Sequence, residues 1–285
     1  MELELIMNYA IGVAYRAGNL LLNHKDNHLF TRKNEFNDIG AYVSEMDKKS
    51  EELIMNMLSL KFPSHNLCGE ENGLIDKNSS YTWYVDPLDG TYNYIREYPM
   101  WGVSIGLAKN QKPIIGVIYF PKLNKLVYAG HNFGAYSNEQ KIQVSKLNYT
   151  EGCYSIPTYK YQEKKQAVIQ LIENMRVTKI HHCSTYDFVC MAEGNTELIL
   201  SGTLAPWDSC AGVCIVREAG GIVVDLDGDD WVMSSNYIVA LNKFENSVLE
   251  ILKDTDIGIL EKNFLVPEIK RKKENTNGQV QKLKH

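Results

Sequence analysis

The segment from Trp83 to Thr91 constrains this chain more than any other part of the sequence. It reads Trp-Tyr-Val-Asp-Pro-Leu-Asp-Gly-Thr, a short apolar strand followed by a turn that carries Asp86 and Asp89. Two carboxylates aimed at one spot offer the oxygen-only ligation that Mg²⁺ prefers. The backbone N–H groups of Gly90 and Thr91 can hold an anion if a helix or turn begins there. The segment predicts phosphate-ester chemistry, although these residues also suit an ordinary turn.

Two further acidic segments favour the chemical interpretation. Glu70 and Glu71 follow the short apolar run Leu67-Cys68, at the expected end of a strand, where a side chain can reach a site above the sheet edge. Asp208 precedes an apolar run that ends at Glu218-Ala219-Gly220-Gly221, which predicts a helix with aspartate near its N-cap and glycine at its stop. Helix capping alone would also explain Asp208.

The three segments together resemble the inositol monophosphatase family of lithium-sensitive, Mg²⁺-dependent phosphatases. One family signature is matched by Asp86 to Thr91 with the aromatic stretch behind it, and a second by Trp207-Asp208-Ser209-Cys210-Ala211-Gly212 with 218–221. The family's Gly-Glu-Glu motif is matched by Gly69 to Glu71. The resemblance covers about residues 5 to 265. It implies a layered α/β/α/β/α sandwich, of the inositol-monophosphatase and fructose-bisphosphatase type, with the active site where two lobes meet.

The resemblance also implies a ligand set and a mechanism. Two or three Mg²⁺ ions would be held by Glu70, Asp86, the carbonyl of Leu88, Asp89 and Asp208. Thr91 and Asp47 would align and deprotonate the attacking water, with Glu70 counted among the catalytic residues. Substrate contacts would come from Leu88, Gly90, Thr91, Ser201 and Asp208. Glu71 is expected to lie next to the metal ligands without binding the metal itself.

Asp47 has a second interpretation that needs no catalysis. Ser44 and Asp47, three residues apart at the start of an expected helix, have the form of a capping box. The family carries a Val-Thr-x-x-Asp segment at this position, matched here by Val43 to Asp47 with serine in place of threonine. The resemblance therefore favours the water-orienting role. Lys33 is only an approximate counterpart of a family lysine and is left out of the site.

Two departures from the family pattern concern the substrate. Ser201 stands where animal inositol monophosphatases carry a glutamate that binds sugar hydroxyls, and a serine cannot offer a charged bidentate acceptor. The run His181-His182-Cys183-Ser184-Thr185-Tyr186 replaces a usual Gly-x-Ala-Ala run of small residues. Inositol monophosphate is the default substrate. Histidinol phosphate, fructose 1,6-bisphosphate and a 3′-phosphoadenosine nucleotide stay open, as does a non-catalytic metabolite-binding relative.

Composition narrows the setting of the chain. Its 285 residues exceed a typical single domain, so we expect one phosphatase unit at 1–266 with lobes at about 1–145 and 146–266. The net charge of −5 argues against a nucleic-acid polymer as partner. No apolar run is long enough to span a membrane, and six scattered cysteines indicate a reducing, cytoplasmic setting. The basic tail at 267–285 is expected to be disordered, with RNA contact as the less favoured alternative. A homodimer is implied by the family alone.

Hydrophobic periodicity predicts a chain of mixed helices and strands. An amphipathic helix is expected at 6–22 and a second helix from Ser44 through Leu58 toward Phe62-Pro63, with an irregular loop at 24–41 between them. Strands are expected at 81–85, 103–108, 113–119, 125–129, 134–137, 177–180, 196–200 and 221–225. Further helices are expected at 162–175, 186–193, after Asp208, and at 244–252.

Overall fold

The structure is a computed structural model of the chain. It describes residues 2–23, 30–32, 42–148, 153–155, 173, 177–202, 204–235, 237–243 and 246–253. The expected loop at 24–41 and the expected helix at 162–175 fall mostly outside these residues, and the basic tail at 267–285 falls wholly outside them.

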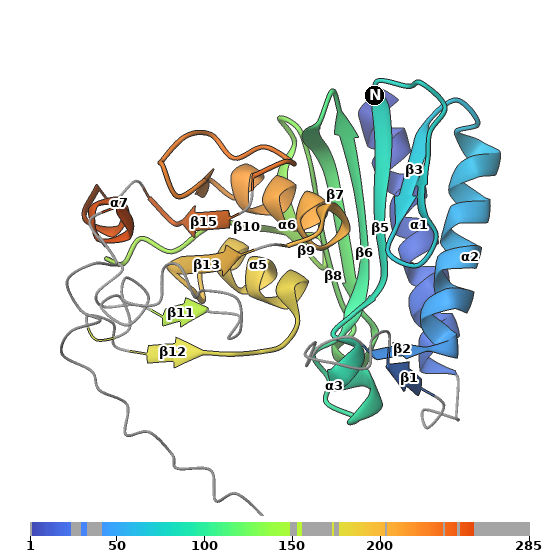
Figure 1. The fold of residues 1–285 in the computed structure, drawn as a ribbon, viewed down its shortest axis with the longest axis horizontal. Coiled ribbons are helices and arrows are strands. Elements are labelled where there is room, and N and C mark those ends of the chain that lie inside the picture. The colour runs from blue at the N-terminus through green and yellow to red at the C-terminus, as the bar shows by residue number, and fades with distance from the viewer. Residues whose placement is uncertain are drawn as a thin grey trace, which may run out of the picture. The chain divides into compact units, whose positions relative to one another are not determined.

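An eight-stranded sheet forms the larger half of the described chain (Figure 1). Its strand order is β10-β9-β8-β7-β6-β5-β3-β4, and every neighbouring pair is antiparallel except β3 and β5. The strands are β3 (Asn66–Gly69), β4 (Gly73–Ile75), β5 (Tyr81–Asp89), β6 (Gly102–Lys109), β7 (Lys112–Phe120), β8 (Lys125–Gly130), β9 (Gly134–Ser137) and β10 (Gln140–Ile142).

Helices cover both faces of this sheet, and this explains why its central strands are apolar without alternation. All residues of β6 except the last are buried, as expected for a strand with no face toward water. Helices α1 (Glu2–Leu22) and α2 (Glu45–Lys61) pack on one face, and α5 (Ser184–Ala192) and α6 (Pro206–Glu218) pack on the other. A short hairpin of β1 (Phe30–Arg32) and β2 (Tyr42–Ser44) precedes α2, and α3 (Thr91–Ile95) follows β5.

A second, five-stranded sheet packs against α5 and α6 from their other side. Its order is β12-β11-β13-β15-β14, and α7 (Asn246–Lys253) covers its far face through Val248 and Leu249. The result is the layered α/β/α/β/α sandwich that the resemblance implied. No helix in the described ranges is long and apolar enough to cross a membrane. The strands are β11 (Cys153–Ser155), β12 (Val177–Lys179), β13 (Leu198–Gly202), β14 (Ile222–Val224) and β15 (Tyr237–Leu241).

One expectation about local structure is wrong. The Asp-Pro-Leu-Asp segment is not a turn: β5 continues to Asp89 with a shift in its pairing to β6 between Asp86 and Asp89. Pairing with β6 keeps the backbone extended past the residue where local propensity would stop it. Ser44 ends β2 and α2 begins at Glu45, so Ser44 stands directly before the helix, where a capping residue belongs.

Helix α6 approaches the large sheet at two glycines that pair across β6 and β7, Gly106 and Gly116. A Cβ at Gly116 would lie 2.3 Å from the carbonyl oxygen of Ala211 in α6, and one at Gly106 would lie 2.6 Å from Sγ of Cys210. The absence of side chains at these two positions lets the helix backbone lie almost directly on the strands. This close approach sets the distance between α6 and the large sheet. It thereby also sets the position of Asp208, which lies in the first turn of α6.

A glycine exchange tests this contact. Replacing Gly116 by alanine is expected to lower the free energy of unfolding by about 1–3 kcal/mol, because the backbone of α6 must move. Gly12→Ala is the matched control: Gly12 is exposed on α1 with nothing within 4 Å of an added Cβ, and alanine should stabilise that helix by roughly 0.5–1 kcal/mol. Urea unfolding of both variants measures the difference. Equal effects would show that α6 does not rest on Gly116.

Candidate functional site

Asp86 and Asp89 lie at the end of β5, on either side of the pairing shift. Side chains three apart in a regular strand point to opposite faces, and an irregularity in the pairing redirects one of them. The two carboxylates are close enough that the charge of Asp89 acts on the pKa of Asp86. The irregularity in β5 therefore brings the two carboxylates together, as the turn was expected to do.

Glu70 and Asp208 join these two carboxylates from other elements. Glu70 follows the last residue of β3, and its N–H donates to the carbonyl of Val85 at 3.2 Å, beside the end of β5. Asp208 lies in the first turn of α6, where its Oδ2 accepts a hydrogen bond from the N–H of Ala205 at 3.1 Å. Asp208 thus caps the helix, as its alternative interpretation required, and also faces the other acids.

Burial and neighbouring charges raise the pKa values of two of these carboxyl groups. Asp86 is 2% exposed, and its pKa lies well above the usual range because of burial, then the charges of Glu70, Asp89 and Asp208. A hydrogen bond from the N–H of Leu88 opposes that rise. Burial, followed by the charges of Asp89 and Glu70, raises the pKa of Asp208 to about 8. Carboxylates held together in this way require either protons or cations.

The donor set fits a hard divalent cation, since it consists of carboxylate oxygens with the Leu88 carbonyl beside them. Each aspartate has one oxygen held by a backbone N–H: Asp86 by Leu88 at 2.9 Å, Asp208 by Ala205 at 3.1 Å, and Asp89 by Thr185 at 2.6 Å. In the described ranges, no group of three or more His, Cys, Asp or Glu side chains is already placed to hold a metal ion. These backbone hydrogen bonds fix the orientations of the three aspartate side chains.

Thr91 and Asp47 meet beside the acids. The Thr91 hydroxyl lies 3.1 Å from Oδ1 of Asp47 and 3.1 Å from the carbonyl oxygen of Leu88, so one proton serves two acceptors. Asp47 is 1% exposed although it comes from the first turn of α2. The pair that the resemblance implied is therefore adjacent in space, across 44 residues of sequence.

The buried face of α2 holds two further parts of the site. The Ser50 hydroxyl donates to the carbonyl of Pro87 at 3.0 Å, which braces the end of β5. The fully buried Glu51 carboxylate accepts from the N–H groups of Glu71 and Asn72, both at 2.8 Å, and from Nδ2 of Asn72 at 2.7 Å. Glu51 thereby fixes the turn that carries Glu70.

Sequence analysis missed Glu51, although a signal was present. Asp47, Ser50 and Glu51 share one helix face by spacing, and that face is buried. Polar residues on the buried side of a helix need partners, so the pattern itself points to a bracing role. Gly69 belongs to the same device: a Cβ there would lie 2.5 Å from Cδ of Glu51.

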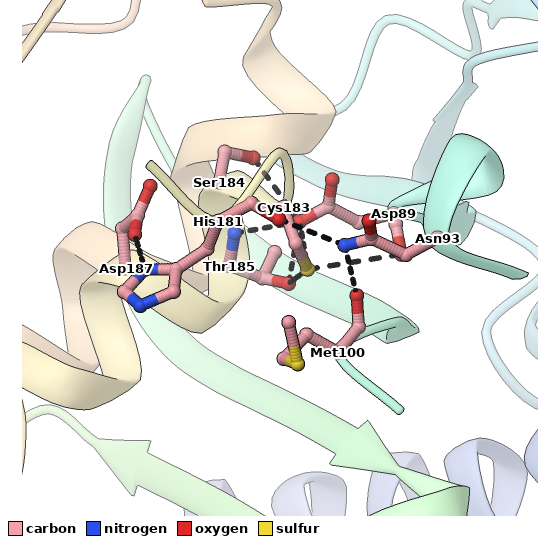
Figure 2. Close-up of polar contacts among 8 residues, drawn as sticks. All are labelled: Asp89, Asn93, Met100, His181, Cys183, Ser184, Thr185 and Asp187. Carbon is pink, nitrogen blue, oxygen red and sulfur yellow. Dashed lines mark hydrogen bonds and ion pairs between the residues drawn. The ribbon is translucent and has the colours of Figure 1, made fainter. Parts of the chain in front are cut away.

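Gly90 connects the acids to the start of α5. Its φ of +82° is in the left-handed region, and a Cβ would lie 2.8 Å from the carbonyl oxygen of Met100. Asn93 in α3 donates from Nδ2 to the carbonyls of Met100 and His181, at 2.7 and 2.8 Å. The segment before α5 is thus tied to the segment after Asp89 (Figure 2).

Ser201 does not join this group as expected. It lies within β13, paired with Ile238, and is 1% exposed with no hydrogen-bond partner for its hydroxyl among the described residues. Counting seven residues back from Asp208 placed it at the substrate. Strand β13 extends through residue 202 and buries Ser201, and its contact with a substrate stays a prediction. Lys33 lies outside the described residues.

Exchanging Glu51 for glutamine tests the bracing role of α2. The variant keeps the shape but turns one acceptor into an N–H₂ group that faces a backbone N–H, so we expect a loss of roughly 1–3 kcal/mol in the free energy of unfolding. Glu52→Gln, on the exposed side of the same helix, is the matched control and should be nearly neutral. Urea unfolding compares the two. Similar small effects in both would remove Glu51 from the site's support.

The pKa of Asp208 predicts a pH dependence for the metal-free protein. The folded-state value of about 8 lies above the ordinary value of 3.8, so folding takes up a proton between these pH values. Stability is therefore highest at low pH in this window and is lost as the pH rises through about 8. Thermal unfolding with a chelator from pH 5 to 9 should show this decline, and Asp208→Asn should make it less steep, with Asp86 still contributing. An unchanged slope in the variant would contradict the assignment.

Comparisons with known proteins identify the family of the chain. The model of the inositol monophosphatase family matches residues 2–256. A protein of Aquifex aeolicus named fructose-1,6-bisphosphatase/inositol-1-monophosphatase is 33% identical, over 85% of this chain and 93% of its own length. The Nus factor SuhB of Xylella fastidiosa is 33% identical, over 79% and 83%.

A solved structure shows the same fold. The extragenic suppressor protein SuhB of Bartonella henselae has a TM-score of 0.79 at 28% identity, and the match covers 88% of this chain and 99% of that one. Sequence and fold agree over nearly the entire described part of the chain. The chain belongs to the inositol monophosphatase family.

Proposed function

We propose that this protein is a Mg²⁺-dependent phosphatase that hydrolyses a small phosphomonoester. The observation that carries the proposal is the meeting of Glu70, Asp86, Asp89 and Asp208 from three separate elements, with their charges acting on one another. Phosphatase activity agrees with the family and with the name of the Aquifex relative. The choice of Mg²⁺ as the metal and of a small phosphomonoester as the substrate is part of what we propose.

The proposed metal ligands are the four carboxylates and the carbonyl oxygen of Leu88. Bound there, two or three Mg²⁺ ions would neutralise the acids and the phosphate and lower the pKa of a water. Leu88 is itself fully buried, and its carbonyl already faces the Thr91 hydroxyl at 3.1 Å. The proposal places these groups around one phosphate.

Thr91 and Asp47 are proposed to handle the proton of the attacking water. When Thr91 donates its proton to Oδ1 of Asp47, the hydroxyl oxygen keeps its lone pairs for a proton from water. Asp47 then serves as the acceptor at the end of this short relay. The N–H groups of Gly90 and Thr91 would hold the phosphate, in keeping with the start of α3 at Thr91.

Inositol monophosphate is the proposed default substrate. Histidinol phosphate, fructose 1,6-bisphosphate and a 3′-phosphoadenosine nucleotide share the same hydrolytic chemistry and differ in the leaving group. The segment that would meet that group includes His182, which is exposed at a φ of +54° with its ring 6.1 Å from that of Tyr92. A homodimer, a cytoplasmic location and inhibition by Li⁺ complete the proposal on family grounds.

Phosphate release tests the proposal directly. The full chain is assayed on inositol, sugar, histidinol and nucleotide phosphates, with and without Mg²⁺ and Li⁺. Asp89→Asn should lower turnover on the order of a hundredfold or more, because a charged ligand becomes neutral at the reacting centre. Asp227→Asn, on an exposed loop, is the control and should leave turnover unchanged. Turnover without Mg²⁺, or one that survives Asp89→Asn, would overturn the proposal.

A second candidate function follows from the relatives named Nus factor SuhB, such as that of Xylella fastidiosa. A protein of that kind could keep the fold and the metal site without needing turnover. The same assay separates the two candidates. Metal binding with no turnover of any phosphate ester would favour the non-catalytic one.

A further inference from the structure

One oxygen of Asp89 is surrounded by donors from the start of α5 (Figure 2). Its Oδ2 accepts from the N–H of Thr185 and from the Thr185 hydroxyl, each at 2.6 Å. The Ser184 hydroxyl and the Cys183 thiol lie 3.2 Å from the same oxygen. The two short bonds occupy the lone pairs of Oδ2, and the two longer contacts close its sides. We call these three side chains the Asp89 cup.

The cup is more than an ordinary helix cap. The residue at the N-cap position of α5, Cys183, makes no side-chain capping bond, and Asp89 caps the helix from β5 instead. An ordinary helix cap needs only one hydrogen bond, from a free backbone N–H at the helix start to a side-chain acceptor. The N–H of Thr185 already makes that bond to Asp89. The hydroxyls and the thiol add donors that fix the rotation of the carboxylate.

Burial keeps these donors aimed at Asp89. Thr185 is fully buried and Cys183 is 2% exposed, so neither side chain can turn to water instead.

The cup lies in a run that departs from the resemblance, which gives Gly-x-Ala-Ala at this place. In this chain the corresponding stretch includes Cys183-Ser184-Thr185. Sequence analysis related this stretch to the leaving group, and in the structure its three residues contact Asp89.

We propose that the Asp89 cup positions Asp89 for the metal ion, by binding Oδ2 and leaving Oδ1 as the single oxygen for the cation. Thr185 is the principal positioning residue, because it makes both short bonds. Partners behind a metal ligand raise affinity by holding the ligand in place before the metal arrives. The inference rests on the proposed metal site.

The test is the affinity of the full chain for Mn²⁺, measured by calorimetry and by the loss of the free-ion paramagnetic resonance signal. Thr185→Val keeps the shape and the backbone N–H but removes the hydroxyl, and is expected to weaken Mn²⁺ binding about tenfold. Thr185→Ser restores the hydroxyl and should bind within about twofold of the wild type. Thr196→Val is the matched control: Thr196 is a buried threonine whose hydroxyl has no partner among the described residues.

The outcomes separate this inference from the function it rests on. Weaker binding in Thr185→Val alone supports the cup, and equal binding in all four proteins overturns it while the metal site stands. A wild type that binds no Mn²⁺ overturns the proposed function itself. Circular dichroism checks that each variant is folded. If Thr185→Val fails to fold, Ser184→Ala replaces it, with a smaller expected loss of affinity, and unchanged binding there counts against the cup.

Discussion

Mutual repulsion among four carboxylates is the constraint on which the rest of this structure depends. Asp86 is almost completely buried with three other acids acting on it, and such a group is stable only with protons, cations or donors around it. The fold supplies donors wherever it can: a backbone N–H for one oxygen of each aspartate. What remains is a set of oxygens that a hard cation would satisfy.

Precision in this site comes from regular elements behind the irregular segments. The turn after β3 and the bulged end of β5 carry the acids, and neither has much structure of its own. Helix α2 holds both from one buried face, through Glu51 and Ser50, while Asp47 on the same face meets Thr91. A metal centre requires rigid support behind the segments that carry its ligands, because a displaced ligand costs affinity.

The sequence was informative where chemistry is local and uninformative where it depends on distant partners. The acids and Thr91 lie in short motifs, so their convergence could be anticipated from a resemblance. Glu51 and Thr185 act on residues 20 and 96 positions away, and no local pattern connects such pairs. The burial of Ser201 is a similar case: counting along the chain located the residue, but the pairing of β13 with β15 decides its burial. The bulge in β5 likewise reflects pairing with β6, which local turn propensity does not contain.

The order in which the chain is made adds a consequence to the Asp89 cup. Every strand of the large sheet is complete by Ile142, whereas the partners of Asp89 come from residues 183 to 185, and Asp208 comes later still. Glu70, Asp86 and Asp89 belong to the part of the chain that is synthesised first, and Thr185 and Asp208 are added later. Until residues 183 to 185 have been made, Asp89 has none of the donors of its cup. Three of the four acids are therefore in the chain before the segment that holds one of them in place.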